Sequence, residues 1–339
     1  MSGETRAETR TVPRGWGHAL PKRRVSNEEL SKTLDTSDEW IRQRTGIRER
    51  RVAGDDETTS TLARDAARMA LANAGWTADT VDLFVVVTAT PDLTFPSVAC
   101  LVQAELDNHG AAAFDLAAAC SGFVYGLSVV DALLRGGGHR RALLMGAEVF
   151  SRILDWNDRR TAVLFGDGAG AVALEAAGPG DGDGDGAGDD GEARRGIIST
   201  HLFADGSHSE ALRTTGGVVC GAAPGVVTME GREVYRHAVV RMAEAVEAAL
   251  AANGMGSDDV DWFIPHQANL RLMETMAERL GIVRERMLVS VDRHANTSAA
   301  SIPLLVSEES AAGRFRRGDL LLLEALGAGF TWGSALLRW

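Results

Sequence analysis

Cys120 is the residue of this sequence whose setting points most directly to chemistry. It lies in the segment Ala-Ala-Ala-Cys-Ser-Gly-Phe, between a hydrophobic run over residues 111–116, which predicts a buried strand, and an apolar helical pattern over residues 123–134. A cysteine at a helix N-terminus meets unpaired N–H groups and the positive end of the helix dipole, which favour the nucleophilic thiolate. Most free cysteines are small buried hydrophobic residues, so this segment alone leaves both interpretations open.

Two further residues with catalytic potential follow predicted strands. His266 comes directly after a buried apolar strand that ends at a proline, and Asn296 follows a predicted strand over residues 287–291. Taken singly, such a histidine is usually structural and such an asparagine is usually a turn former. A cysteine nucleophile, however, is typically assisted by a distant His and Asn that meet it in space. Because α/β proteins bind ligands beyond the carboxyl ends of their strands, the three residues together favour a catalytic site.

The composition limits the classes of protein that fit. The 339 residues are 45% hydrophobic, which suffices for one large domain or two closely packed halves. A net charge of −12 argues against a general nucleic-acid binder. No run approaches the ~20 apolar residues that span a bilayer, and residues 1–15 lack the apolar core of a signal peptide. Three widely spaced cysteines without metal-binding spacing predict a cytoplasmic protein with no metal site.

An internal repeat indicates how the chain is organised. Residues 70–84 and 249–263 align without gaps at an offset of 179, and eight of fifteen positions are identical. In both segments an amphipathic helix ends at a Gly turn and a buried strand follows through Val-Asp. A period this long indicates two similar halves, and alternating helical and strand patterns predict an α/β fold. We predict an N-terminal half over residues 1–177, an acidic Gly/Asp-rich loop over 178–195 and a C-terminal half over 196–339.

The acidic loop also matches a calcium-binding pattern, which we set aside as a remote alternative. The pattern uses Asp181, Asp183, Asp185, Gly186 and Glu192. The flanking segments predict strands where a calcium loop has helices, and low-complexity Asp-Gly sequence produces this pattern easily.

Taken together, the three chemical segments and their surroundings resemble β-ketoacyl-acyl-carrier-protein synthase III, the enzyme that starts type II fatty acid synthesis. The resemblance runs from about residue 15 to residue 339. It rests on eight segments, namely residues 35–41, 44–50, 95–97, 117–122, 165–171, 265–271, 296–301 and 329–336.

This resemblance implies a thiolase-like fold, a duplicated five-layer αβαβα sandwich that is usually homodimeric. It also implies a short acyl-CoA primer, with acetyl-CoA expected, and malonyl-acyl-carrier protein as substrates, with no cofactor. Cys120 would carry the acyl group, and His266 and Asn296 would donate hydrogen bonds to the enolate formed by decarboxylation. The backbone N–H groups of Cys120 and Ala328 would hold the later oxyanion. Asn296 favours an initiating enzyme, since elongating relatives carry a second His there.

Other positions match the family's binding residues, with ordinary packing or solvation as the alternative for each. By resemblance, Trp40 and Arg159 sandwich the CoA adenine, and Phe95 reaches across the dimer to bound the partner's acyl pocket. The positions that match the pantetheine channel or CoA contacts are Thr36, Arg44, Gly231 and Asn269. We expect a basic patch for the acidic carrier protein at Arg232, Arg236 and Arg271.

Two departures from the family pattern concern the size of the primer. Ala295 replaces the Gly that usually precedes the catalytic Asn, and Ala328 replaces the middle Gly of the turn at residues 327–329. Each adds a methyl group and restricts φ. Two alternatives stay open at this point: an enzyme that loads or transfers an unusual starter in a polyketide or secondary-metabolite pathway, and a cysteine-dependent thioesterase.

Overall fold

Two β-sheets form the frame of the protein. The computed structural model describes residues 9–178, 195–220 and 225–339. The first sheet has the order β1-β7-β6-β4-β5, with bounds β1 (Arg10–Ala19), β7 (Gly168–Ala177), β6 (Arg141–Glu148), β4 (Leu83–Val87) and β5 (Ala112–Leu116). The second has the order β11-β12-β13-β8, with bounds β11 (Trp262–Pro265), β12 (Leu320–Gly327), β13 (Thr331–Arg338) and β8 (Gly196–Ala204).

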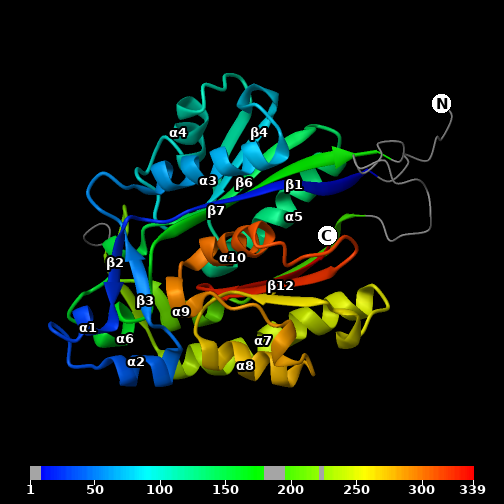
Figure 1. Cartoon of the computed structure of the whole chain (residues 1–339). Helices are drawn as coiled ribbons and strands as arrows, with labels where there is room; N and C mark the ends of the chain where they lie inside the picture. Colours follow the sequence, from blue (N-terminus) through cyan, green and yellow to red (C-terminus); the bar gives the residue numbers. More distant parts are fainter. Residues whose placement is uncertain (1–8, 179–194, 221–224) are drawn as a thin grey trace.

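Helices cover both sheets and also fill the space between them (Figure 1). The outer face of the first sheet carries α3 (Thr59–Ala74) and α4 (Val98–Glu105). Helices α5 (Gly122–Arg135) and α10 (Ser301–Ala311) lie between the sheets, and α7 (Gly231–Ala252) with α8 (Leu270–Arg279) lies beyond the second. The order of layers is αβαβα, which confirms the predicted five-layer architecture.

Shorter elements connect these layers. The strands are β2 (Arg23–Ser26), β3 (Glu49–Val52), β9 (Leu212–Thr214) and β10 (Val227–Met229). The helices are α1 (Asn27–Leu30), α2 (Asp38–Thr45), α6 (Arg159–Ala162) and α9 (Val291–His294). The 3₁₀ turns are η1 (Ala78–Thr80), η2 (Ala119–Ser121), η3 (Phe150–Ile153), η4 (Gly206–Ala211), η5 (Ser257–Asp259), η6 (Arg284–Arg286) and η7 (Ser298–Ala300).

The repeat seen in the sequence is a repeat of structure. Helix α3 ends at Gly75, which has φ of 68°, and the chain passes through η1 into β4. Helix α7 is followed by Gly254, with φ of 64°, and the chain passes through η5 into β11. Glycine takes this left-handed backbone without steric cost, which is why both copies keep it.

Parallel pairing gathers chain ends at one edge of each sheet. In the first sheet, β4 pairs in parallel with both β5 and β6, so all three strands end at the same edge. In the second, β11 pairs in parallel with β12. Residues that follow these strands therefore meet, as expected for ligand sites in α/β folds.

Close backbone contact brings the two halves together at that edge. A Cβ on Gly146 of β6 would lie 2.4 Å from the carbonyl oxygen of Ala299, and one on Gly170 of β7 would lie 2.3 Å from the backbone nitrogen of Leu304. Glycine at these positions lets η7 and α10 rest directly on the first sheet. The segment that carries Asn296 is thereby pressed against the half that carries Cys120.

Two strand predictions were wrong in part. The run at residues 111–116 forms β5 as predicted, but β5 is an edge strand and its side chains are at most half-buried rather than buried. Of the predicted strand over residues 287–291, only Met287 pairs, through a single bridge to Phe263. The side-chain oxygen of Gln267 accepts the backbone N–H groups of Ser290 and Val291 at 2.8 and 3.2 Å, so the chain turns into α9 instead of pairing.

Some predictions fall partly or wholly outside the described residues. All but the end residues of the acidic loop at 178–195, and the whole of its calcium-like pattern, lie there. The first sheet is built from residues before 178 and the second from residues after 195, while the predicted division at these positions stays a prediction. Within the described ranges, none of the helices combines the length and apolar character that crossing a membrane requires.

Candidate active site

Cys120 lies where the sequence predicts, in the turn between β5 and α5. It sits in η2, 7% exposed, and Ala119 before it has φ of 45°. Gly327 at the end of β12 approaches so closely that a Cβ there would lie 2.7 Å from the Cys120 nitrogen. The cysteine is therefore enclosed by backbone from both halves of the chain.

The expectation that the resting cysteine favours the thiolate was wrong. Burial raises the pKa of the Cys120 thiol to about 12, and the nearby Glu148 carboxylate raises it further, while the Ser298 hydroxyl acts in the opposite direction. Loss of hydration is the largest of these effects. At this pKa the resting Cys120 side chain is a neutral thiol.

His266 is held as a neutral hydrogen-bond donor. It follows β11 and is almost fully buried, and burial lowers its pKa to about 3. Its Nδ1 lies 2.7 Å from Ser301 Oγ, which itself accepts the backbone N–H of Gln267 at 3.4 Å. We assign the Ser301 hydroxyl proton to the bond with Nδ1, which places the ring proton of the neutral imidazole on Nε2.

Asn296 is oriented by the loop that precedes β7. Its backbone N–H donates to the Leu164 carbonyl at 2.9 Å, and its carbonyl accepts the N–H of Gly166 at 3.0 Å. The side-chain oxygen accepts the backbone N–H of Ser298 at 2.8 Å. The Nδ2 group therefore faces away from that bond with its donors available.

The three residues line one cavity of about 110 Å³. Its other walls are mainly apolar and come from both halves, namely Leu164, Phe165, Leu212, Met229, Gly231, Val234, Tyr235, Ala238, Met242, Ala268, Asn269, Leu272 and Leu326. Cys120 and His266 are 146 positions apart in the sequence, and His266 and Asn296 are 30 apart. The structure brings all three to the wall of the same cavity.

One buried acid beside Cys120, Glu148, escaped the sequence analysis. Glu148 ends β6 and is fully buried, and it accepts hydrogen bonds from Thr90 Oγ1 at 2.7 Å, the Ala89 backbone N–H at 3.1 Å and Ser298 Oγ at 3.0 Å. Burial raises the pKa of Glu148 to about 7, against these hydrogen bonds, which lower it. A carboxylate at the end of an otherwise apolar strand run was the signal that could have revealed it.

A second hollow of about 570 Å³ opens outside the cavity and shares four lining residues with it, Leu164, Gly231, Tyr235 and Asn269. Trp40, Arg44 and Arg159 line its far side. The guanidinium groups of Arg44 and Arg159 lie 4.7 and 5.3 Å from the Trp40 ring centre. A nucleotide base stacked between the Trp40 ring and a guanidinium makes two contacts of ~3.5 Å, so the two groups must be about 7 Å apart. Arg159 must therefore move away from Trp40 before a base can enter between them.

The remaining predicted binding residues divide into two groups. Gly231 and Asn269 line both hollows, and Arg232 and Arg271 line the outer one. Thr36 and Arg236 belong to neither lining. Five arginines surround the outer hollow, so its rim is basic although the chain is acidic (Arg44, Arg159, Arg160, Arg232 and Arg271).

Ala328 and Phe95 occupy contrasting positions. Ala328 lies in the turn between β12 and β13, where its carbonyl accepts Thr331 Oγ1 at 3.1 Å; that hydroxyl also lies 2.8 Å from Ser121 Oγ, beside the nucleophile. Phe95, by contrast, is 82% exposed on the loop between β4 and α4. Within a single chain, Phe95 does not line the cavity that contains Cys120.

Backbone strain gathers around the site. The described non-glycine residues with positive φ are Asp107, Ala119, Ala295 and Ser298, and the last three adjoin Cys120 or Asn296. Ala295 has φ of 58° and ψ of −159°, a combination that essentially only glycine takes without cost. The substitution of Gly by Ala at this position therefore strains the turn.

Comparison with known proteins places this geometry in a family. Residues 114–206 match the sequence profile of 3-oxoacyl-[acyl-carrier-protein (ACP)] synthase III, and residues 250–339 match that of its C-terminal part. The chain is 53% identical over 330 residues to the β-ketoacyl-[acyl-carrier-protein] synthase III of Sinorhizobium medicae, covering 97% of this chain and 99% of that protein.

Solved structures agree. The crystal structure of 3-oxoacyl-[acyl-carrier-protein] synthase III from Aquifex aeolicus superposes with a TM-score of 0.89 at 42% identity, covering 97% of this chain and all of that one. The priming β-ketosynthase of the R1128 polyketide biosynthetic pathway superposes with a TM-score of 0.88 at 32% identity, covering 99% of this chain and 98% of that one.

The raised thiol pKa predicts a pH dependence for alkylation of Cys120. Because thiolate forms only as pH approaches about 12, the rate of reaction with iodoacetamide should rise about tenfold per pH unit from pH 6 to 9 without a plateau. Peptide mass spectrometry separates Cys120 from Cys100 and Cys220, and the Cys120→Ala variant gives the background. A plateau between pH 6 and 8 would show that a thiolate exists at rest.

The strain at Ala295 predicts an unequal effect of two alanine-to-glycine substitutions. Ala300 is equally buried but has ordinary helical φ of −75°. Both substitutions remove one buried methyl group and loosen the unfolded chain, but only Ala295→Gly relieves strain. We expect the Ala295→Gly variant to be more stable than Ala300→Gly by about 1–3 kcal/mol in urea unfolding. Equal stabilities would contradict strain at Ala295.

Proposed function

The chain belongs to the β-ketoacyl-acyl-carrier-protein synthase III family, and we propose that it condenses a short acyl-CoA primer with malonyl-acyl-carrier protein through Cys120, His266 and Asn296. The products are 3-oxoacyl-acyl-carrier protein, CoA and CO₂. One observation carries the assignment of roles: His266 Nε2 and Asn296 Nδ2 are each left free to donate by bonds made on their other sides, and both residues line the cavity of Cys120.

In the first half-reaction the Cys120 sulfur attacks the carbonyl carbon of the acyl-CoA thioester. The carbon–sulfur bond to CoA breaks, CoA leaves as its thiol, and an acyl-enzyme remains. Because the resting nucleophile is a neutral thiol, its proton must leave during attack.

We propose that Glu148 receives this proton through Ser298. The Ser298 hydroxyl influences the pKa of the Cys120 thiol and donates to Glu148 Oε1 at 3.0 Å, so it is placed between the two acids. A pKa of about 7 lets Glu148 hold a proton and release it near neutral pH. The departing CoA thiolate is then protonated by the same route.

The second half-reaction uses the two side-chain donors. Loss of CO₂ from the malonyl group leaves an enolate whose negative charge lies on the thioester oxygen. Hydrogen bonds from His266 Nε2 and Asn296 Nδ2 stabilise that oxygen, and buried neutral donors do so without first giving up water. The enolate carbon then attacks the acyl carbon on Cys120.

The oxyanion of that attack meets backbone donors. The proposed N–H groups are those of Cys120 and Ala328, supported by the close approach of Gly327 to the Cys120 nitrogen. The reaction as proposed needs no cofactor, because the thioester itself accepts the developing charge.

The cavity supports a short primer. Its volume of about 110 Å³ is well below the ~300–1,000 Å³ of typical ligand pockets, which favours a short, acetyl-like primer. The starter-loading alternative has support in the 32% identity to the R1128 priming enzyme, and the preferred primer distinguishes the two functions.

The residues that line the outer hollow suit both proposed substrates. The basic rim suits the phosphates of CoA and an acidic carrier protein, and Trp40 offers an aromatic face for the adenine. Arg232 and Arg271 are placed for carrier docking at the rim, and Arg236 lies farther along α7.

A homodimer and a cytoplasmic setting complete the proposal. The edge strand β5 is half-buried, while Phe95 and Leu93 on the adjoining loop are 82% and 52% exposed. A second copy pairing at this edge would cover these groups. The three cysteines, all free thiols, suit a reducing compartment.

Variants of the donors and of Glu148 should separate the half-reactions. His266→Ala and Asn296→Ala should each slow condensation about 10²–10³-fold while an acyl adduct still forms on Cys120. Glu148→Gln should instead slow adduct formation, because it lacks the proton acceptor. Intact-protein mass spectrometry after addition of acetyl-CoA, then malonyl-acyl-carrier protein, follows both steps.

The Cys120→Ala variant is the control and should form no adduct. An adduct that leaves as free acid would support the thioesterase alternative instead, and a preference for long or branched primers would support starter loading.

Charge reversal at the rim should weaken carrier binding specifically. Arg232→Glu should raise the KM for malonyl-acyl-carrier protein about tenfold and leave kcat nearly unchanged, with a smaller effect at high salt. Arg140→Glu is the matched control, because Arg140 precedes β6 at the edge of the sheet opposite the site. Equal effects of both variants would contradict docking at this rim.

A further inference from the structure

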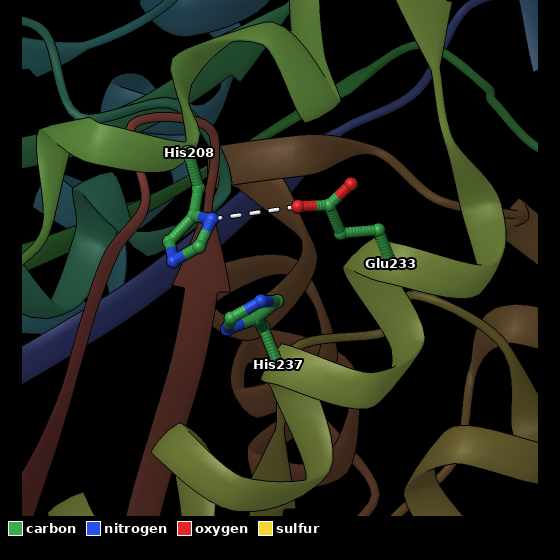
Figure 2. A group of neighbouring side chains, drawn as sticks. All are labelled: His208, Glu233 and His237. Carbon is green, nitrogen blue, oxygen red and sulfur yellow. Dashed lines mark ion pairs between the residues drawn. The ribbon is translucent and has the colours of Figure 1, made fainter.

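A group of two histidines and a glutamate lies outside the catalytic cavity. His208 belongs to η4, and Glu233 and His237 lie one turn apart at the start of α7. Figure 2 shows the three side chains converging from these two elements. One ligand atom from each lies within 4.8 Å of the others, and all three residues are partly exposed.

The closest contacts suit a shared ligand. His208 Nδ1 lies 3.4 Å from Glu233 Oε1, and the two imidazole ring centres are 4.0 Å apart. In a tetrahedral zinc site the ligand nitrogen and oxygen atoms lie ~2.0–2.1 Å from the ion, which places them roughly 3.3 Å from each other. His208 Nδ1 and Glu233 Oε1 therefore already have the spacing of two zinc ligands. Rotation of the partly exposed His237 side chain can bring one of its ring nitrogens to a similar distance from both. The i, i+4 spacing of Glu233 and His237 is one that places two ligands on the same helix face.

An ion pair alone explains only part of the group. A protonated His208 would pair with Glu233, but a second imidazolium 4.0 Å away would be repelled. A neutral imidazole is the form that binds a metal ion.

We propose that His208, Glu233 and His237 bind a zinc ion. Two imidazole nitrogens and one carboxylate form a ligand set found in zinc sites with a fourth, water-filled position. Asp205 provides the outer partner, since its Oδ2 lies 3.8 Å from His208 Nε2, on the far side of the ring from Glu233. Such a carboxylate fixes the ring orientation of a zinc-bound histidine.

The position of the group connects it to the catalytic walls. Both imidazoles pack against Phe330, at ring distances of 5.7 and 5.4 Å. Phe330 exchanges two backbone hydrogen bonds of 2.8 Å with Asp205 and follows the turn that contains Ala328. Zinc would therefore fasten the start of α7, whose Val234 and Ala238 line the cavity, to the segment beside the proposed oxyanion turn.

Zinc binding to the whole protein tests the proposal. Isothermal titration with zinc chloride is made in the Cys120→Ala background, so that the catalytic thiol cannot bind the ion. We expect one site per chain and a rise of several degrees in the melting temperature. His208→Ala, Glu233→Gln and His237→Ala should each weaken binding at least tenfold, since removal of one ligand leaves two.

The matched control is His109→Ala, which removes an exposed histidine from the opposite half. Cobalt(II) gives a second readout, because nitrogen and oxygen ligands yield visible bands without a thiolate charge-transfer band. Loss of the site in the three variants, with retention in His109→Ala, supports the proposal. No binding, binding unchanged in the three variants, or a thiolate band from Cys220 would overturn it. All variants should melt cooperatively without zinc, because the mutated side chains are partly exposed.

Discussion

The hydrogen bond between His266 and Ser301 sets the orientation of the imidazole ring in the cavity of Cys120. Ser301 Oγ lies 2.7 Å from Nδ1, and burial keeps the ring neutral by lowering its pKa to about 3. Asn296 follows the same principle, because the Ser298 backbone N–H occupies its side-chain oxygen. In the proposed reaction both residues would be oriented as donors before any substrate arrives, and such preorganisation stabilises a developing negative charge.

This arrangement depends on the contact between the two halves. Ser301 and Ser298 belong to the segment that rests on the first sheet, where Gly146 and Gly170 permit backbone contact. The same segment carries the strained residues Ala295 and Ser298. Strain of this kind persists only where surrounding packing fixes the chain. The duplicated fold thus supplies the rigidity that holds the donors in place.

Burial raises the pKa of both acids beside Ser298, but to very different values. It keeps the Cys120 thiol neutral, with a pKa of about 12, and it raises the pKa of Glu148 to about 7. A neutral thiol next to a carboxylate near its own pKa is a pair between which a proton can pass. At the mouth the electrostatics differ, since arginines on an acidic protein create a local positive field that remains solvated.

The α/β class, the repeat and the positions of Cys120 and His266 after predicted strands could be predicted from the sequence, because each of them depends on a short local pattern. The structure brings both residues to one cavity together with Asn296. The Gly75 and Gly254 turns and the ends of β5 and β11 appear as short patterns, so Cys120 and His266 were placed correctly. The strand expected before Asn296 failed, because Gln267, distant in sequence, captures the N–H groups of Ser290 and Val291.

Three features could be seen only once the chain was folded: the raised pKa of Cys120, the burial of Glu148 beside it, and the meeting of His208 with Glu233 and His237. Each depends on which groups from separate elements exclude water or face one another, and that information is not carried by neighbouring residues.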